Sequence, residues 1–398
     1  MCSATSNHIL PEPPENLKCI SAELAEIIRR KITLNGPLSF SEYMEMALYE
    51  PGFGYYSAGL KKLGAGGDFV TAPQLGNVFA RCLATQIRQI GAGIEHYEII
   101  EVGAGSGILA VDLLEALQVT APPRRYRILE RSAHLRQVQK ETLQRHLPHW
   151  MDRVSWMDAP PEAGWQGVLL ANEVLDALSV DRFCLENDAI RQLRVVDAAD
   201  GFDWIKGDCP QAMQTRIQAI FEALEQQPAP GYCSELNTHL PAWLQAVTGS
   251  LQKGVALFID YGYTRRDYYQ PERRDGTLIC HYRQRAHDNP FLWPGLTDIS
   301  ASVDFTALAE AAGFCGLEVS GYTSQAMFLF ACGLAEVVAE FELLPEKERL
   351  MMNNQVRRLT LPGEMGERFQ VMALSRGLNE DLCDELLGFS LSDLSHRL

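Results

Sequence analysis

The chain has 398 residues, of which 46% are hydrophobic, and a formal net charge of −16 at pH 7. This length can bury a large core in one elaborated domain or in two. The negative charge argues against a nucleic-acid backbone as the main partner, because little here would neutralise phosphates.

The composition also bears on location and on structural cross-links. No apolar run is long enough to span a bilayer, so we expect no membrane insertion. The ten cysteines include no Cys-x-x-Cys pair, and we therefore expect reduced thiols, no disulfide framework and no metal site. The first fourteen residues are polar and proline-containing, unlike a signal peptide or a mitochondrial leader, which favours a cytoplasmic location.

The first 90 residues are predicted to form an N-terminal extension ahead of the main domain at 91–398. A helix is expected over 21–35, and Ser39 with Glu42 three residues later matches a capping box at the start of a second helix. A glycine-rich loop follows at 64–73. The segment 39–73 is predicted to be a lid over a site, although an extra packed helix explains the pattern equally well. The lid residues expected to face a substrate are Tyr43, Tyr55, Tyr56, Asp68 and Thr71.

A short apolar strand at 97–102 ends in an acid and then opens into alternating glycines. The pattern Glu-x-Gly-x-Gly-x-Gly places Glu101 before Gly103, Gly105 and Gly107. Strand, glycine turn and helix start form the nucleotide-binding corner of a doubly wound α/β fold. The dinucleotide fingerprint would need glycine where Ile108 stands, which disfavours NAD. The cationic groups of S-adenosylmethionine (SAM) suit an acid here.

Strands and helices alternate beyond this turn. The expected strands are 97–102, 126–130, 154–157, 167–171 and 255–260, with helices at about 108–117, 133–147 and 238–251. This alternation predicts an α/β, Rossmann-like class I SAM-dependent methyltransferase fold with a mainly parallel sheet. Glu130, at the end of the second strand, lies where a carboxylate takes ribose hydroxyls, and Asp158, at the end of the third, could hold the adenine edge.

Polar residues follow the fourth and fifth strands, where open α/β sheets bind ligands. Asn172 is expected to help bind the cofactor, while Glu173 and Asp176 would share one face and need a cation between them. Arginine is the natural cation, although helix capping and first-turn acids explain the same residues. Asp260 would line the same rim, and His287 could accept a proton or cap a loop.

The remaining segments are expected to be insertions into this core and further elements of it. A small β insertion is expected at about 181–206, and loop or helical insertions at about 262–300 and 326–360. A further helix at 303–312 and strands at 316–322 and 369–374 complete the domain.

Several longer motifs of the sequence resemble those of the MidA-like family. These motifs are Gly-Pro-Leu-Ser-Phe-Ser-Glu-Tyr-Met at 36–44, Gly-Tyr-Tyr at 54–56, Gly-Asp-Phe-Val-Thr-Ala-Pro at 67–73, the glycine turn, Asn-Glu-Val-Leu-Asp-Ala-Leu at 172–178, Asp-Tyr-Gly at 260–262, Asp-Ile-Ser-Ala-Ser-Val-Asp-Phe at 298–305 and Met-Gly-Glu-Arg-Phe at 365–369. The resemblance covers about residues 36–374, and the motifs at 67–73 and 172–178 are the most specific to the family.

The family's mitochondrial members are SAM-dependent arginine methyltransferases that assist assembly of respiratory complex I. The resemblance therefore implies SAM as cofactor and a protein arginine as acceptor, with a respiratory complex subunit as one candidate partner. This chain is similar to the bacterial relatives, to which the mitochondrial substrate does not carry over. A SAM-binding assembly chaperone without turnover and a small-molecule methyltransferase stay open as alternatives. The sequence does not indicate the oligomeric state.

Overall fold

The computed structural model describes residues 10–59, 71–187, 189–378 and 385–398. The chain divides into two compact units, each assembled from three separate segments. The first unit comprises Met1–Phe69, Ala177–His239 and Arg266–Ser302, and the second comprises Val70–Asp176, Leu240–Arg265 and Val303–Leu398. None of the described helices is long and apolar enough to cross a membrane.

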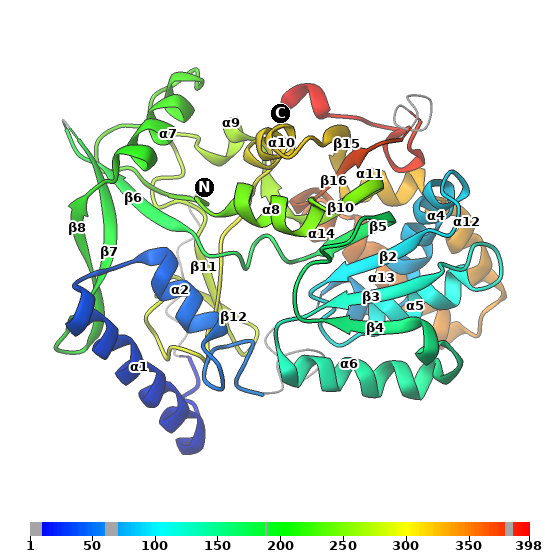
Figure 1. The fold of residues 1–398 in the computed structure, drawn as a ribbon, viewed down its shortest axis with the longest axis horizontal. Coiled ribbons are helices and arrows are strands. Elements are labelled where there is room, and N and C mark those ends of the chain that lie inside the picture. Colours follow the sequence, from blue (N-terminus) through cyan, green and yellow to red (C-terminus); the bar gives the residue numbers. More distant parts are fainter. Residues whose placement is uncertain (1–9, 60–70, 188, 379–384) are drawn as a thin grey trace. The chain divides into compact units, whose positions relative to one another are not determined.

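The second unit is built on one sheet of eight strands (Figure 1). Along the main path the order is β15-β16-β10-β5-β2-β3-β4, and β14 pairs with β10. All neighbours on this path from β10 to β4 are parallel, whereas β16 runs antiparallel to both β10 and β15. The strands are β2 (Glu98–Val102), β3 (Arg125–Leu129), β4 (Val154–Met157), β5 (Trp165–Asn172), β10 (Leu251–Tyr263), β14 (Val303–Asp304), β15 (Glu318–Ser324) and β16 (Phe369–Arg376).

Helices cover both faces of this sheet because its central strands are apolar on both sides. Leu257 of β10 belongs to the same buried cluster as the apolar face of α4 (Val78–Ala92). The next residue, Phe258, contacts Trp243 of α8 (Leu240–Thr248) with ring centroids 6.2 Å apart. Successive strand residues point to opposite faces, so α4 and α8 lie on opposite sides of the sheet.

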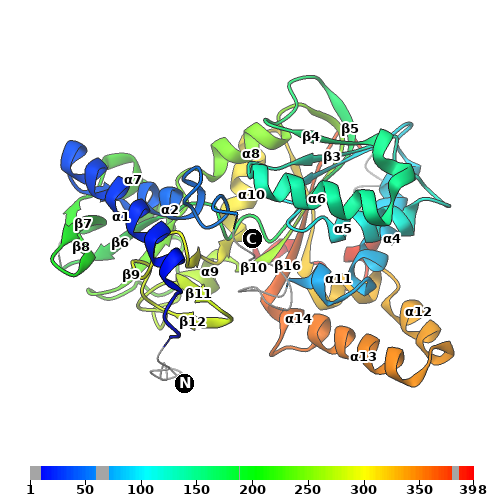
Figure 2. The same ribbon diagram turned by 90° about the horizontal axis from the view of Figure 1, so that it is seen from below.

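The other helices of this unit extend these two layers. Figure 2 shows α4, α5 and α6 together on one side of β3, β4 and β5, below these strands in the view. The helices are α3 (Ala72–Leu75), α5 (Ile108–Leu117), α6 (Ala133–His146), α10 (Phe305–Phe314), α11 (Gln325–Ala331), α12 (Leu334–Ala339), α13 (Glu346–Thr360) and α14 (Met365–Arg368), with 3₁₀ turns η1 (Pro148–Arg153), η2 (Glu340–Leu343), η3 (Leu387–Phe389) and η4 (Ser395–Arg397).

The first unit has a five-stranded sheet and a three-stranded sheet. In the larger sheet, β1 (Leu38–Ser39), β6 (Asp181–Leu185), β7 (Ile190–Ala198), β8 (Gly201–Asp208) and β9 (Cys233–Leu236) pair antiparallel. The smaller sheet has the order β12-β11-β13, with β11 (Ile279–Tyr282), β12 (Arg285–His287) and β13 (Asp298–Ser300). Its helices are α1 (Glu15–Asn35), α2 (Phe40–Tyr49) and α7 (Gln211–Glu222), and the short α9 (Arg265–Tyr268) lies where the chain passes between the units.

Local signals in the sequence predicted most of these elements. The capping box of α2 is confirmed: the Glu42 amide donates to Ser39 Oγ at 3.2 Å, and the Ser39 amide donates to Glu42 Oε2 at 3.0 Å. The β insertion predicted at 181–206 is present as β6, β7 and β8. The predicted parallel α/β fold is confirmed.

The units divide the chain differently from the predicted boundary at residue 90. Helix α4 packs into the core of the second unit, because Leu83 and Ile87 share one buried cluster with Ile99 of β2. The N-terminal helices α1 and α2 share a core with Val195 of β7 and Phe202 of β8. The extension and the β insertion are thus parts of the same compact unit.

Candidate active site

The glycine turn follows β2 at the carboxyl edge of the sheet. Gly103, Gly105 and Gly107 have φ angles of 66°, 53° and 79°, in the left-handed region that favours glycine. A Cβ on Gly107 would also lie 3.1 Å from the Cα of Gln139. Gly107 is therefore packed closely against α6, whereas Gly103 is exposed and leaves backbone that a ligand can approach.

Glu101 lies two residues before the first of these glycines and is only 3% exposed. Its Oε2 accepts a hydrogen bond of 2.8 Å from the Tyr126 hydroxyl on β3. Burial raises the pKa of Glu101 to about 7, and the Tyr126 hydrogen bond only partly opposes this rise. A cation bound beside Glu101 would favour its ionised form and lower this pKa again.

Glu130 follows β3 and is buried, with both oxygens held by the protein. Its Oε1 accepts from the Ser132 amide at 2.9 Å, and its Oε2 accepts from Gln139 Nε2 at 2.9 Å. Burial raises the pKa of Glu130 despite these donors. Each carboxylate oxygen can accept a second hydrogen bond, so the predicted contact with ribose hydroxyls stays a prediction that the geometry permits.

Gln139 of α6 is a site residue that the sequence analysis missed. It is fully buried and also donates to the Gly105 carbonyl at 3.1 Å, while its Oε1 accepts from Trp156 Nε1 at 3.0 Å. The side-chain amide of Gln139 thereby links the glycine turn to Glu130 after β3 and to Trp156 of β4. A glutamine within a helix gives no sequence signal for such a role.

Asp158 follows β4, and its side chain is 89% exposed. It forms an ion pair with Arg136 of α6, and the Arg136 guanidinium also donates to the carbonyls of Glu130 at 2.6 Å and Met157 at 3.2 Å. Arg136 thus holds the ends of β3 and β4 together. The predicted contact of Asp158 with adenine stays a prediction.

Asn172 ends β5 and Glu173 follows it, beside the glycine turn, since Ala171 pairs with Val102. Glu173 has φ 54°, an uncommon conformation for a residue with a side chain. Its amide donates to the Ile259 carbonyl at 2.9 Å, and its Oε1 accepts from Asn172 Nδ2 at 3.2 Å and from the Ala72 amide at 3.3 Å. The hydrogen bond from Ala72 joins the motif at 67–73 to the motif at 172–178. Together these bonds hold the strained backbone of Glu173, and such strain is typical of functional sites.

Asp260 of β10 is the residue that shapes this loop. It is 1% exposed, and its Oδ2 accepts from three successive backbone amides, those of residues 174, 175 and 176, at 3.1, 2.9 and 3.2 Å. Its Oδ1 accepts from the amide of Tyr261 at 2.9 Å. Burial, followed by the negative charges of Asp176 and Glu173, raises the pKa of Asp260 well above its ordinary value. This geometry fits the positioning of Glu173 and Asp176 better than direct contact with a substrate.

The remaining predicted site residues are distributed between the units. Thr71 precedes α3 in the second unit and makes no side-chain capping bond. Asp68 lies outside the described residues. Tyr43, Tyr55, Tyr56 and His287 belong to the first unit, and the predicted lid stays a prediction.

Within the first unit, the tyrosines of the predicted lid have structural contacts. Tyr43 is fully buried, and its hydroxyl donates to the Pro290 carbonyl at 3.0 Å. Tyr55 is also buried, while the Tyr56 hydroxyl donates to Asp298 Oδ1 at 3.0 Å. Burial lowers the pKa of His287, which keeps its imidazole neutral near pH 7. A neutral imidazole can accept a proton, and this role of His287 stays a prediction.

The carboxyl edge of the second unit fits SAM in three respects. The glycine turn exposes backbone, and the acids of this edge, including Glu101 and Glu173, favour a cationic ligand. In addition, Asn172 Oδ1 is buried and accepts no hydrogen bond from any residue in the described ranges. An unpaired buried acceptor is costly, and the ammonium group of SAM would supply the missing donor.

This sheet order, with one reversed strand and a glycine turn after β2, defines a class I SAM-dependent methyltransferase. The comparisons with known proteins agree: residues 78–323 match the family described as S-adenosyl-L-methionine-dependent methyltransferases. The chain belongs to this family, and the predicted resemblance, enzyme class and cofactor are confirmed at that level.

Individual relatives cover almost the whole chain. A COG1565 superfamily member from Burkholderia thailandensis, solved with S-adenosylhomocysteine bound, is 38% identical with a TM-score of 0.91 and covers 98% of this chain and 100% of its own. The mitochondrial protein arginine methyltransferase NDUFAF7 homolog of Drosophila melanogaster is 26% identical, over 96% of this chain and 91% of its own. Its bovine counterpart is 28% identical, over 91% and 85%.

Proposed function

We propose that this methyltransferase transfers the methyl group of SAM to an arginine side chain of a protein. The observation behind the proposal is the pair of acids Glu173 and Asp176, which follow β5 beside the glycine turn and are positioned by Asp260 of β10. Relatives named protein arginine methyltransferases, which match over most of their length, support an arginine acceptor.

The chemistry of the acceptor explains why acids are needed. SAM supplies an electrophilic methyl group on a sulfonium, and the acceptor nitrogen must be held in line with the bond that breaks. A guanidinium is always protonated in water and donates five N–H groups in a planar fork. Glu173 and Asp176 would bind that fork through paired hydrogen bonds and draw its positive charge away from the attacking nitrogen.

The positions of these acids are set by other groups of the chain. Asp260 fixes the backbone of residues 174–176, and Asn172 and the Ala72 amide hold the Glu173 carboxylate. The carboxylates that would bind the methyl acceptor therefore lie on a pre-formed loop after β5. This reduces the reorganisation needed during methyl transfer. We further propose that the acceptor protein is a respiratory complex subunit or its precursor, and that the enzyme acts in the cytoplasm.

The proposal is tested by identifying the labelled product. The purified protein is incubated with methyl-labelled SAM and an extract of cells from which its gene has been deleted. Protein is then hydrolysed, and the labelled amino acids are separated and assigned by mass spectrometry. We expect label in methylarginine. Label in lysine, glutamine or a small molecule would contradict the arginine proposal, and SAM binding without any transfer would favour an assembly chaperone.

A further inference from the structure

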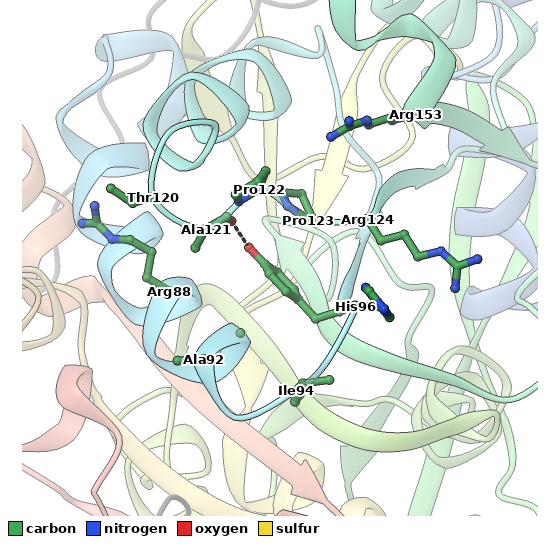
Figure 3. A pocket seen from close by; sticks show the side chains of 12 residues that line it. Arg88, Ala92, Ile94, His96, Thr120, Ala121, Pro122, Pro123, Arg124 and Arg153 are labelled. Atoms are coloured by element: carbon green, nitrogen blue, oxygen red, sulfur yellow. Dashed lines mark hydrogen bonds between the residues drawn. The ribbon is translucent and has the colours of Figure 1, made fainter.

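A second site candidate lies in the second unit, at the opposite edge of the sheet from the glycine turn. It is a pocket of about 670 Å³ at the amino ends of β2, β3 and β4. The glycine turn, in contrast, follows the carboxyl end of β2. The pocket is lined by Arg88, Gly91, Ala92, Ile94, His96, Tyr97, Thr120, Ala121, Pro122, Pro123, Arg124 and Arg153 (Figure 3).

Each of the connections that lead into β2, β3 and β4 contributes an arginine. Arg88 lies in the last turns of α4, ahead of β2, while Arg124 and Arg153 directly precede β3 and β4. Figure 3 shows the three guanidinium groups on different sides of the pocket instead of pointing toward one another. A single small anion would therefore not engage all three groups.

Two of these arginines contact uncharged partners within the described part of the chain. Arg88 Nη2 donates to Thr85 Oγ1 at 2.9 Å, and the Arg153 guanidinium lies over the Trp150 ring, 5.3 Å from its centroid. Arg124 makes no side-chain hydrogen bond or ion pair with any described residue, and no described carboxylate lines the pocket.

Two acids close to the start of β2 have partners other than these arginines. Glu98 is already paired with Arg127 at 2.9 Å. Glu95 is 3.4 Å from His96 Nε2, and both of these side chains are highly exposed. In a chain of net charge −16, three arginines around one pocket without a lining acid form a local positive region.

The floor of the pocket is apolar. Ile94 and Tyr97 are buried, and the Tyr97 hydroxyl donates to the Ala121 carbonyl at 2.5 Å. Pro122 and Pro123 have restricted backbones and complete this surface. The pocket volume lies in the range of ordinary ligand sites, large enough for one apolar side chain with its flanking residues.

We propose that this pocket binds an acidic segment of a partner protein, with an apolar side chain against the floor and at least two carboxylates on the surrounding arginines. Separate arginines on different sides fit several carboxylates spaced along a chain. The segment would dock away from the methyl-transfer edge and independently of the acceptor arginine, so this inference does not rest on the proposed function.

The experiment measures fluorescence anisotropy of a labelled, capped peptide Asp-Glu-Leu-Asp-Glu on the full chain saturated with S-adenosylhomocysteine. We expect saturable binding with a Kd below about 1 mM that weakens with added salt. The double variant Arg124→Gln/Arg153→Gln should weaken binding about tenfold. The control Arg357→Gln/Arg358→Gln makes the same charge change on α13, at residues that do not line the pocket, and should alter the Kd by less than about twofold.

Four outcomes would overturn the proposal. They are no saturable binding, equal weakening by both double variants, equal binding of the peptide Lys-Arg-Leu-Lys-Arg, and full displacement by inorganic phosphate or citrate at the peptide's own concentration. The last result would assign a simple anion site. Circular dichroism of both double variants confirms that each is folded before its Kd is compared.

Discussion

Asp260 connects β10 to the acids after β5 by accepting the three amides of residues 174–176 on one oxygen. We predict that Asp260→Asn, which replaces one acceptor oxygen by a donor, lowers the methyl-transfer rate while leaving SAM affinity within a few-fold. Buried amides without an acceptor cost about 1–3 kcal/mol, which corresponds to about a 5- to 160-fold loss of rate.

The measurement compares the initial rate of label transfer with the SAM dissociation constant from calorimetry. The exposed carboxyl change Glu346→Gln on α13 is the matched control and should alter neither quantity. If Asp260→Asn abolishes SAM binding as well, Asp260 shapes the cofactor site and not only the acceptor loop.

Glu101 provides a pH-dependent prediction, because burial raises its pKa to about 7. Below this pH the carboxyl is neutral and gains little from the cationic groups of SAM. Above it the carboxylate attracts them. We therefore predict that SAM binds more tightly as pH rises from about 5.5 to 7.5, by up to tenfold per unit below the pKa.

Titration calorimetry at several pH values measures this dependence. In Glu101→Gln the dependence should flatten, because the amide has no proton to lose in this range. An affinity of the unchanged protein that is constant across these pH values would show that Glu101 does not face the charge of SAM.

Residues whose role comes from a motif could be predicted, and residues whose role comes from packing could not. The spacing of the glycines indicated the turn, because left-handed backbone requires glycine. The burial of Asp260 and the central position of Gln139 depend on strands and helices that meet only in the fold. No local pattern carries that information.

At the scale of elements, a row of close contacts crosses the amino end of the sheet. Gly254 of β10 pairs with Gly167 of β5, which in turn pairs with Glu98 of β2. A Cβ on Gly254 would lie 1.8 Å from the Gly167 carbonyl oxygen, and φ at Gly254 is 150°. The backbones approach so closely that no side chain fits between them.

We predict that Gly254→Ala lowers the free energy of unfolding by at least about 3 kcal/mol, the scale of a severe core change. Gly313→Ala is the matched control: this glycine lies in α10 with nothing within 4 Å of a built Cβ, so alanine should stabilise by about 0.5–1 kcal/mol. Chemical denaturation of both variants measures the difference. Equal stability of the two would contradict the close contact in the sheet.

Elements with a strong periodic pattern were predicted closely, and α5 begins and ends where its apolar residues do. The helical run expected at 326–360 is instead interrupted. Gly333 has φ 88° before α12, and Pro345 is the N-cap of α13, so each residue starts a new helix. Because apolar residues continue at helical spacing across both breaks, the hydrophobic pattern does not indicate where one helix ends and the next begins.

At the scale of the whole molecule, the chain returns twice to each unit. The short strand β1 pairs with β7, more than 150 residues later in the sequence, as Leu38 opposite Val195. Such pairing unites the N-terminal helices with the β insertion in the first unit. The sequence alone predicts these segments as an extension and a separate insertion, because pairing between distant strands leaves no local signal.

The central claim is that the acids after β5 bind a cationic acceptor beside SAM, and Glu173→Gln tests it most directly. Glutamine preserves the shape and can still accept from Asn172 and the Ala72 amide, so only the charge is lost. Removing one partner of a buried charge pair costs about 3–5 kcal/mol, so transfer should fall at least about 100-fold.

The decisive measurement is label transfer from SAM into protein arginine, with SAM affinity measured on the same preparations of wild type, Glu173→Gln and the surface control Glu346→Gln. The account predicts unchanged SAM affinity in all three proteins and loss of transfer only in Glu173→Gln. Equal labelling by wild type and Glu173→Gln would contradict it, and would leave Glu173 with the structural role that its hydrogen bonds to Asn172 and Ala72 already show.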